Sequence, residues 1–176
     1  MSTRIIRLLS AAILLGLLAY SQRVPPELGQ GWLAEFNLAA QHTAALADAI
    51  PAEKFGWRPA PGVRSVGEVY MHIAIGNYFL LGQAGVRVPQ EIAAQIKPDT
   101  EKSVTAKPDI IKWLKDSQEL VRTSYPKADL KKQVKFFGND ATADGVFLRI
   151  LVHNHEHMGQ SVAYARSIGV KPPWSE

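Results

Sequence analysis

The 176-residue sequence predicts an all-α protein, a four-helix bundle with crossover connections. Four segments repeat apolar side chains at helical spacing, proline and glycine separate these segments, and no pair of segments has the pattern of a sheet. Each predicted helix has one apolar stripe, which it can bury only against the other helices. The longer connections permit crossovers in place of simple hairpins.

The first helix is expected over residues 28–50, where apolar side chains recur at helical spacing until Pro51 ends the pattern. A proline-rich loop follows. Ser65 and Glu68 then have the spacing of a capping box, in which each side chain accepts a hydrogen bond from the other residue's backbone N–H. A second helix should therefore begin here and continue to about Gly82.

The third predicted helix lies in the second half of the chain. Residues 89–105 before it are mixed, with one short helix expected over 90–95. Pro108 suits the first turn of the third helix, and the pattern stops before Pro126.

The fourth helix is expected over residues 142–168, and Gly169 ends it. Before it, residues 133–137 could form one extended piece, but a single piece makes no sheet. The domain organisation is therefore a leader over 1–21, one helical domain over 28–169 and a C-terminal tail over 170–176.

The leader has the features of a secretory signal. Arg4 and Arg7 precede an apolar run over residues 8–20, which is shorter than the roughly 20 residues that span a bilayer as a helix. Ala19 and Ser21 supply small residues for cleavage. We therefore expect export to the periplasm or the extracellular space; an uncleaved membrane anchor is the alternative.

Composition excludes several classes of protein. Hydrophobic residues make up 47% of the chain and charged residues 20%, which excludes a disordered chain and a polytopic membrane protein. The chain has no cysteine, so disulfides and a thiolate nucleophile are excluded, and a metal site must use histidine, carboxylates and water. Without the leader, the net charge falls from +4 to +2, with no basic stripe for a phosphate backbone. We expect no nucleic-acid partner.

Three of the five histidines could converge on one site. His153 and His157 are one turn apart on the last predicted helix and form, with Gln160, a stripe beside its apolar face. His72 has the same position on the second predicted helix. Side chains at this i, i+4 spacing have Cβ atoms about 5–6 Å apart, so two imidazoles can reach one metal ion through bonds of about 2.0–2.1 Å. A third ligand from His72 would leave at least one coordination position open.

Other interpretations of these residues stay open at this point. A histidine pair at this spacing also occurs at surfaces and in satisfied cores. Asn154 stands where the zinc-peptidase motif His-Glu-x-x-His has glutamate, so that class is not predicted. Glu156 lies close enough on the helix to support a ligand. Tyr164 could reach a substrate or pack at the bundle edge. We expect a structural position for His42, and for His155 a position that faces solvent or packs behind the stripe of His153 and His157.

This arrangement resembles the DinB/YfiT-like superfamily of metalloenzymes. The family pattern has one histidine on the second helix and His-x-x-x-His followed by x-Gly-Gln on the last, as in His72, His153, His157, Gly159 and Gln160.

The segment from 51 to 65, with Phe55-Gly56-Trp57-Arg58-Pro59 at its centre, also looks like the stretch before the family's first metal histidine. The resemblance covers residues 32–169 and implies a four-helix bundle with a divalent metal held by the three histidines. Met158 departs from the family, in which arginine or histidine often precedes Gly-Gln. Relatives transfer low-molecular-weight thiols, or look like hydrolases.

The leading functional hypothesis is an exported, metal-dependent hydrolase or thiol transferase that acts on a small molecule. The metal would acidify a bound water or thiol, and Gln160 is the expected catalytic residue that orients the nucleophile. Zinc is the expected ion, with nickel, iron(II) and manganese as alternatives. The competing hypothesis is a non-catalytic metal-binding or structural bundle. Exposed aromatic residues such as Trp174 leave a homodimer open, and a membrane contact is expected only if the leader is uncleaved.

Overall fold

The computed structural model describes residues 28–175. The expected signal over residues 1–21 lies outside this range. No helix in residues 28–175 combines the length and apolar character needed to cross a membrane.

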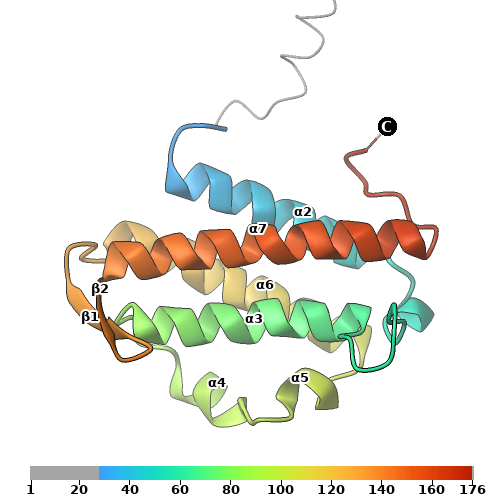
Figure 1. Ribbon diagram of the computed structural model, residues 1–176, viewed down its shortest axis with the longest axis horizontal. Coiled ribbons are helices and arrows are strands. Elements are labelled where there is room, and N and C mark those ends of the chain that lie inside the picture. Colours follow the sequence, from blue (N-terminus) through green and yellow to red (C-terminus); the bar gives the residue numbers. More distant parts are fainter. Residues whose placement is uncertain (1–27, 176) are drawn as a thin grey trace, which may run out of the picture.

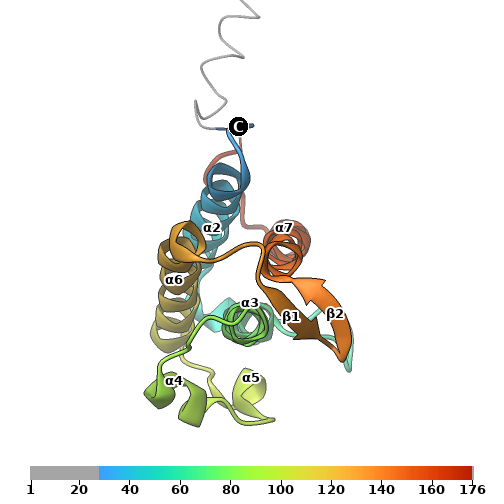
Figure 2. The same ribbon diagram turned by 90° about the vertical axis from the view of Figure 1, so that its left-hand side faces the viewer.

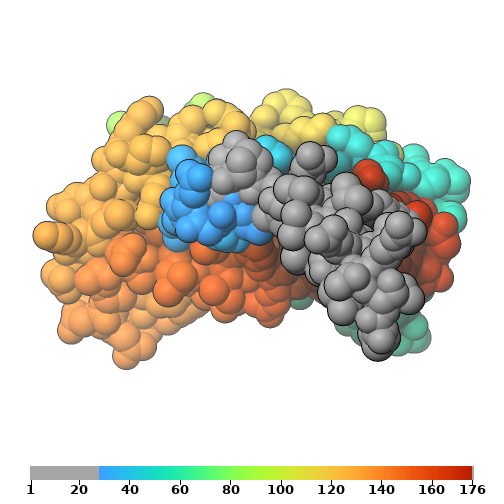
Figure 3. All heavy atoms as spheres, turned by 90° about the horizontal axis from the view of Figure 1, so that it is seen from above, coloured from blue at the N-terminus to red at the C-terminus, as the bar shows by residue number. Residues whose placement is uncertain are grey.

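Four long helices form a bundle: α2 (Trp32–Ala49), α3 (Val66–Gln83), α6 (Lys107–Ser124) and α7 (Ala143–Ser167) (Figure 1). Both α2 and α3 pack on α6 and on α7. The consecutive helices α2 and α3 therefore lie diagonally across the bundle (Figure 2), and the segment between them is a crossover. Figure 3 shows α2 and α7 against each other on one face of the molecule. The predicted four-helix bundle with crossover connections is confirmed.

The start of α3 has the predicted capping box. Ser65 Oγ accepts a hydrogen bond from the backbone N–H of Glu68 at 3.2 Å, and Glu68 Oε2 accepts one from the backbone N–H of Ser65 at 2.8 Å. The proline-rich loop before it contains the 3-10 helix η1 (Ala52–Lys54). The helix α2 starts four residues later than expected, after Gly31, whose φ is 110°.

Two short helices lie between α3 and α6. The expected α4 (Gln90–Gln95) is present, and a further helix, α5 (Thr100–Ser103), was not predicted. Four residues are too few to show a periodic pattern. Thr100 stabilises the preceding turn, because its hydroxyl accepts from the backbone N–H of Lys97 at 2.7 Å and donates to the carbonyl of Gln95 at 3.1 Å.

A β-hairpin corrects the expectation that the chain has no sheet. The strands β1 (Gln133–Phe136) and β2 (Asn139–Thr142) pair antiparallel, after the 3-10 helix η2 (Tyr125–Lys127). Phe137 and Gly138 in the turn have φ values of 48° and 85°, the positive values that a two-residue hairpin turn needs. The prediction was wrong because phenylalanine is unusual at such a turn position and the second strand is short and polar.

The core consists of two apolar clusters with buried polar residues between them. One cluster is built around Tyr70 and Leu114, the other around Phe147 and Ile150. Between them along the helices, Asn77 Nδ2 donates to Ser117 Oγ at 3.1 Å, and the Nδ2 of Asn154 donates to Asn77 Oδ1 at 2.7 Å. All three side chains are fully buried. These bonds fix the register of α3, α6 and α7 relative to one another.

Candidate metal centre

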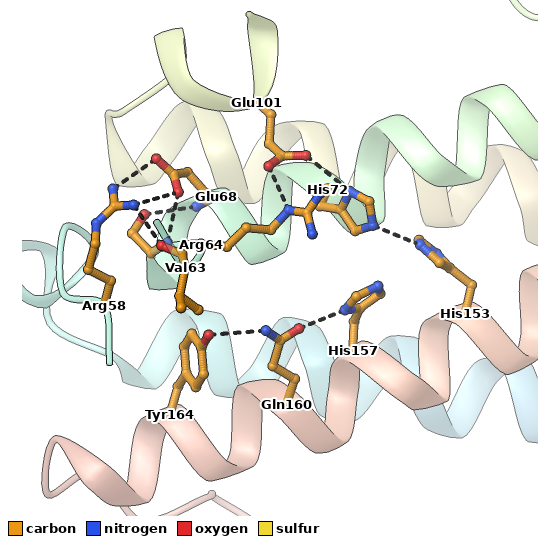
Figure 4. A network of polar contacts seen from close by, with 11 residues as sticks. Arg58, Val63, Arg64, Glu68, His72, Glu101, His153, His157, Gln160 and Tyr164 are labelled. Atoms are coloured by element: carbon orange, nitrogen blue, oxygen red, sulfur yellow. Dashed lines mark hydrogen bonds and ion pairs between the residues drawn. The ribbon is translucent and has the colours of Figure 1, made fainter. Parts of the chain in front are cut away.

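The structure brings His72, His153 and His157 together between α3 and α7 (Figure 4). One ring nitrogen of each histidine lies within 4.8 Å of the corresponding nitrogen of the other two. The Nε2 atoms of His72 and His153 are 3.2 Å apart. His153 and His157 are buried, whereas the side chain of His72 is 27% exposed. The predicted convergence of the three imidazoles is therefore present, with access to solvent on the His72 side.

A glycine on α3 makes room for one of these imidazoles. Gly76 lies one turn after His72, and a Cβ atom at this position would lie 2.5 Å from Cε1 of His153. Real Cβ atoms do not approach another heavy atom so closely, so any larger residue would push the ring away. Gly76 was not among the site residues predicted from the sequence. A glycine inside a helix is about 1 kcal/mol less favourable than alanine. A glycine only one turn from His72 was therefore the sequence signal that could have indicated a close contact at this position.

Glu101 holds the ring of His72. Its Oε2 lies 3.0 Å from His72 Nδ1, and its Oε1 accepts a hydrogen bond of 2.6 Å from Nε of Arg64. The carboxylate favours a proton on Nδ1 of His72, which leaves the lone pair of Nε2 directed toward the other two rings. Glu101 could not be predicted as a site residue, because it comes from the unexpected helix α5, 29 residues from His72.

Gln160 holds the ring of His157. Its Oε1 lies 2.7 Å from His157 Nδ1, and its Nε2 donates to the hydroxyl oxygen of Tyr164 at 3.1 Å. Both polar groups of the Gln160 amide are therefore engaged. These contacts orient a histidine, and the expected catalytic role of Gln160 in positioning a nucleophile stays a prediction. Tyr164 also packs edge-on against Trp57.

The environment keeps two of the imidazoles neutral. Burial is the largest cause that lowers the pKa of His153 to about 3; His157, His72 and Arg149 act in the same direction, and Glu156 acts in the opposite one. Burial also lowers the pKa of His72, with Arg64 and His157 acting in the same direction and Glu101 in the opposite one. Neutral imidazole is the form that binds metal ions.

The donor set fits a divalent transition metal. Three imidazoles are a common ligand set for zinc, nickel and iron(II), and two of them have the hydrogen-bonded Nδ1 that is typical of metal-binding histidines. The facing Nε2 atoms of His72 and His153 can share one cation or one proton. The buried Nδ1 of His153 has no hydrogen-bond partner within residues 28–175. Such an unsatisfied buried atom destabilises the fold, and one explanation for it is a role in a functional site.

The other residues considered in the sequence lie outside this cluster. Glu156 does not support a ligand histidine through a hydrogen bond; its Oε2 pairs with Nη2 of Arg149 at 3.0 Å on the surface. His42 stacks on Trp174 with ring centroids 4.0 Å apart. The Nε2 of His155 lies 3.3 Å from a backbone oxygen of α2. These contacts account for both histidines structurally.

Comparisons with known proteins agree on the family. The family model of the DinB superfamily matches residues 35–161. A search of curated proteins finds no significant match. Among solved structures, a DinB-like protein from Bacillus cereus is 21% identical, with a TM-score of 0.66 over 82% of this chain and 95% of its own. The DinB-like protein YjoA from Bacillus subtilis is 18% identical, with a TM-score of 0.59 over 78% of this chain and 91% of its own.

A third similar structure comes with a described function. YfiT from Bacillus subtilis is 13% identical, with a TM-score of 0.58 over 84% of this chain and 91% of its own. It is described as a probable metal-dependent hydrolase with an unusual four-helix bundle topology. At these identities the structural likeness establishes the fold, and the match of the family model over most of the chain establishes the family. The chain belongs to the DinB superfamily.

Proposed function

We propose that this protein is a metal-dependent enzyme that holds a divalent ion through His72, His153 and His157. The observation that carries the proposal is the convergence of three ring nitrogens within 4.8 Å of one another from two helices. The description of YfiT as a probable metal-dependent hydrolase supports the same class of chemistry. The substrate is a small molecule, and the reaction is hydrolysis or the transfer of a low-molecular-weight thiol.

The residues around the histidines prepare them for this role. Glu101 and Gln160 accept hydrogen bonds from Nδ1 of His72 and His157 and so present Nε2 to the ion. When bound, a divalent ion supplies Lewis acidity, which polarises a substrate oxygen and acidifies a water or thiol. Three protein ligands leave a position open, as in catalytic sites. The partial exposure of His72 supports entry from solvent beside α3.

Zinc is the proposed ion, because three imidazole nitrogens suit its tetrahedral coordination. Nickel, iron(II) and manganese are the alternatives that metal analysis will distinguish. We further propose export to the periplasm or the extracellular space, on the basis of the leader over residues 1–21, and no nucleic-acid partner, on the basis of the mature net charge of +2.

Metal analysis of untagged protein tests the proposal. We expect about one equivalent of a divalent ion per chain and its loss in His153→Ala. The variant His155→Ala is the matched control, because this histidine lies on the same helix and outside the cluster. Absence of stoichiometric metal, or equal occupancy in the wild type and His153→Ala, would contradict the metal site.

Activity is tested separately on the metal-loaded protein. Activated esters probe hydrolysis, and small thiols with an electrophilic acceptor probe thiol transfer. We expect turnover in one of these assays that disappears in His153→Ala and persists in His155→Ala. Stoichiometric metal without turnover in either assay would favour the competing hypothesis of a non-catalytic metal-binding bundle.

A further inference from the structure

Arg64 lies beside the candidate metal centre and is held there by the same carboxylate as His72. Its Nε donates to Oε1 of Glu101 at 2.6 Å, while the other oxygen of Glu101 lies 3.0 Å from His72 Nδ1. One carboxylate therefore contacts both the guanidinium of Arg64 and the ring of His72 and sets their positions relative to each other. Figure 4 shows the guanidinium next to His72, on the side of the rings toward the start of α3.

Most hydrogen-bonding capacity of Arg64 is unused. A guanidinium has five N–H donors, and the Nε contact uses one of them. Within residues 28–175, Nη1 and Nη2 of Arg64 have no acceptor, and the side chain is 40% exposed. Arg58 in the same loop differs, because both of its Nη atoms bind Glu68 and its Nη1 also donates to the carbonyl of Val63.

A second hydrogen-bond donor, the hydroxyl of Tyr164, lies on α7. The hydroxyl oxygen of Tyr164 on α7 accepts a hydrogen bond from Gln160 Nε2. Since His157 needs its proton on Nδ1 to bind a metal through Nε2, the Gln160 oxygen must face His157, and its amide nitrogen must face the tyrosine. The O–H of Tyr164 is then left as a donor. Figure 4 shows Tyr164 and Arg64 on the same side of the three imidazoles.

We propose that Nη1 and Nη2 of Arg64, with the hydroxyl of Tyr164, bind an anionic group of the substrate beside the metal centre. The planar guanidinium fork matches the two oxygens of a carboxylate or phosphate. This inference rests on the proposed function and adds the substrate class: a small molecule with a carboxylate or phosphate close to the reacting bond. A divalent ion at the neighbouring histidines adds to the attraction of this anion.

Calorimetric titration of the metal-loaded protein with inorganic phosphate and with acetate tests the inference, and shows which anion is preferred. We expect Arg64→Gln to weaken binding of the preferred anion about tenfold or more, because hydrogen bonds between charged groups are stronger than those between neutral groups. Arg64→Lys keeps the charge and the reach to Glu101 but loses the fork, so its affinity should be intermediate. Tyr164→Phe keeps the ring against Trp57 and should weaken binding severalfold.

Arg149→Gln is the matched control. Arg149 also lies close enough to lower the pKa of a cluster histidine, but its guanidinium pairs with Glu156 on the surface. Its loss should change anion affinity by less than twofold. If Arg64→Gln and Arg149→Gln weakened anion binding equally, the effect would come from the net charge of the protein and not from a specific site. This result would overturn the inference. So would unchanged affinity in Arg64→Gln, or no binding of either anion to the wild type.

Metal content is measured for every variant, so that a failure of the proposed metal site can be distinguished from a failure of the proposed anion site. Stoichiometric metal with no dependence of anion binding on Arg64 overturns only the anion site. A wild type without metal overturns the proposed function, and titration of phosphate into that metal-free protein still tests Arg64 by itself. Metal content that is normal in Arg64→Gln would also show that the variant is folded and that Glu101 still supports His72.

Discussion

The imidazole of His153 lies against the backbone of Gly76, so close that a Cβ at Gly76 would be 2.5 Å from Cε1 of the ring. The contact joins the middle of α3 to the middle of α7 at the point where the three histidines meet. It explains why a residue with no side chain stands inside a helix, one turn after His72. The candidate metal centre therefore depends on a glycine as well as on its histidines.

Gly76→Ala should weaken metal binding about tenfold or more, because the added methyl group displaces the His153 ring from the other two. Gly159→Ala is the control, since a Cβ at Gly159 meets no atom within 4 Å. The control should keep the metal affinity and gain up to about 1 kcal/mol of helix stability. Competition with a chelator gives both affinities. Equal affinities in the two variants would show that the ring does not need this space.

Glu101→Gln should lower metal affinity by about 10- to 100-fold, the usual effect of losing the carboxylate behind a ligand histidine. The side chain keeps its length but no longer accepts from His72 Nδ1 with a full negative charge. Glu91→Gln on α4 removes an exposed charge outside the site and serves as the control. If the two variants bind metal equally well, the contact between Glu101 and His72 has no role in binding.

Gln160→Ala separates an orienting role from a catalytic one. If Gln160 mainly orients His157 through the 2.7 Å contact to Nδ1, the variant should bind metal about tenfold more weakly and recover its turnover at saturating metal. If Gln160 orients the nucleophile, kcat should stay low at full metal occupancy. Metal titrations followed by activity assays distinguish the two outcomes.

Stability of the metal-free protein should fall as the pH is lowered. The pKa of His153 is about 3 in the folded protein, against an ordinary value of 6.5, so the unfolded chain binds more protons between these values. The contribution of His153 is complete above about pH 6.5 and is lost as the pH falls toward 3. Urea unfolding at pH 7.5 and pH 5 measures this loss.

His153→Gln removes the titrating group and should therefore lose less stability than the wild type over the same pH range. The carboxylates titrate in both proteins, so the difference between them isolates the histidine. A loss of equal size in both proteins would mean that the folded protein does not hold His153 in its neutral form.

Asn154→Ala should destabilise the fold by about 1–3 kcal/mol, because it leaves the buried oxygen of Asn77 without its 2.7 Å hydrogen bond. Asn139→Ala changes an exposed residue of the hairpin and should shift the free energy of unfolding by less than about 0.5 kcal/mol. Thermal or urea unfolding of the two variants gives the comparison. A neutral Asn154→Ala would show that the buried amides do not hold α3 and α7 in register.

The sequence by itself determined the helical bundle and the three histidines. Apolar periodicity is a local signal that persists over several turns, and the capping box at Ser65 and Glu68 is complete within four residues. The i, i+4 spacing of His153 and His157 likewise places both rings on one side of α7 whatever the helix packs against. Local chemistry was sufficient for these features.

Only the tertiary structure decided how the site is supported. Glu101 reaches His72 from a four-residue helix that is too short for any periodic signal, and Arg64 joins the site through Glu101. Gly76 matters only because His153 arrives from another helix. The diagonal placement of α2 and α3 and the hairpin at β1 and β2 also depend on contacts between distant segments. Such contacts arise from packing in three dimensions, so residue spacing along the chain does not encode them.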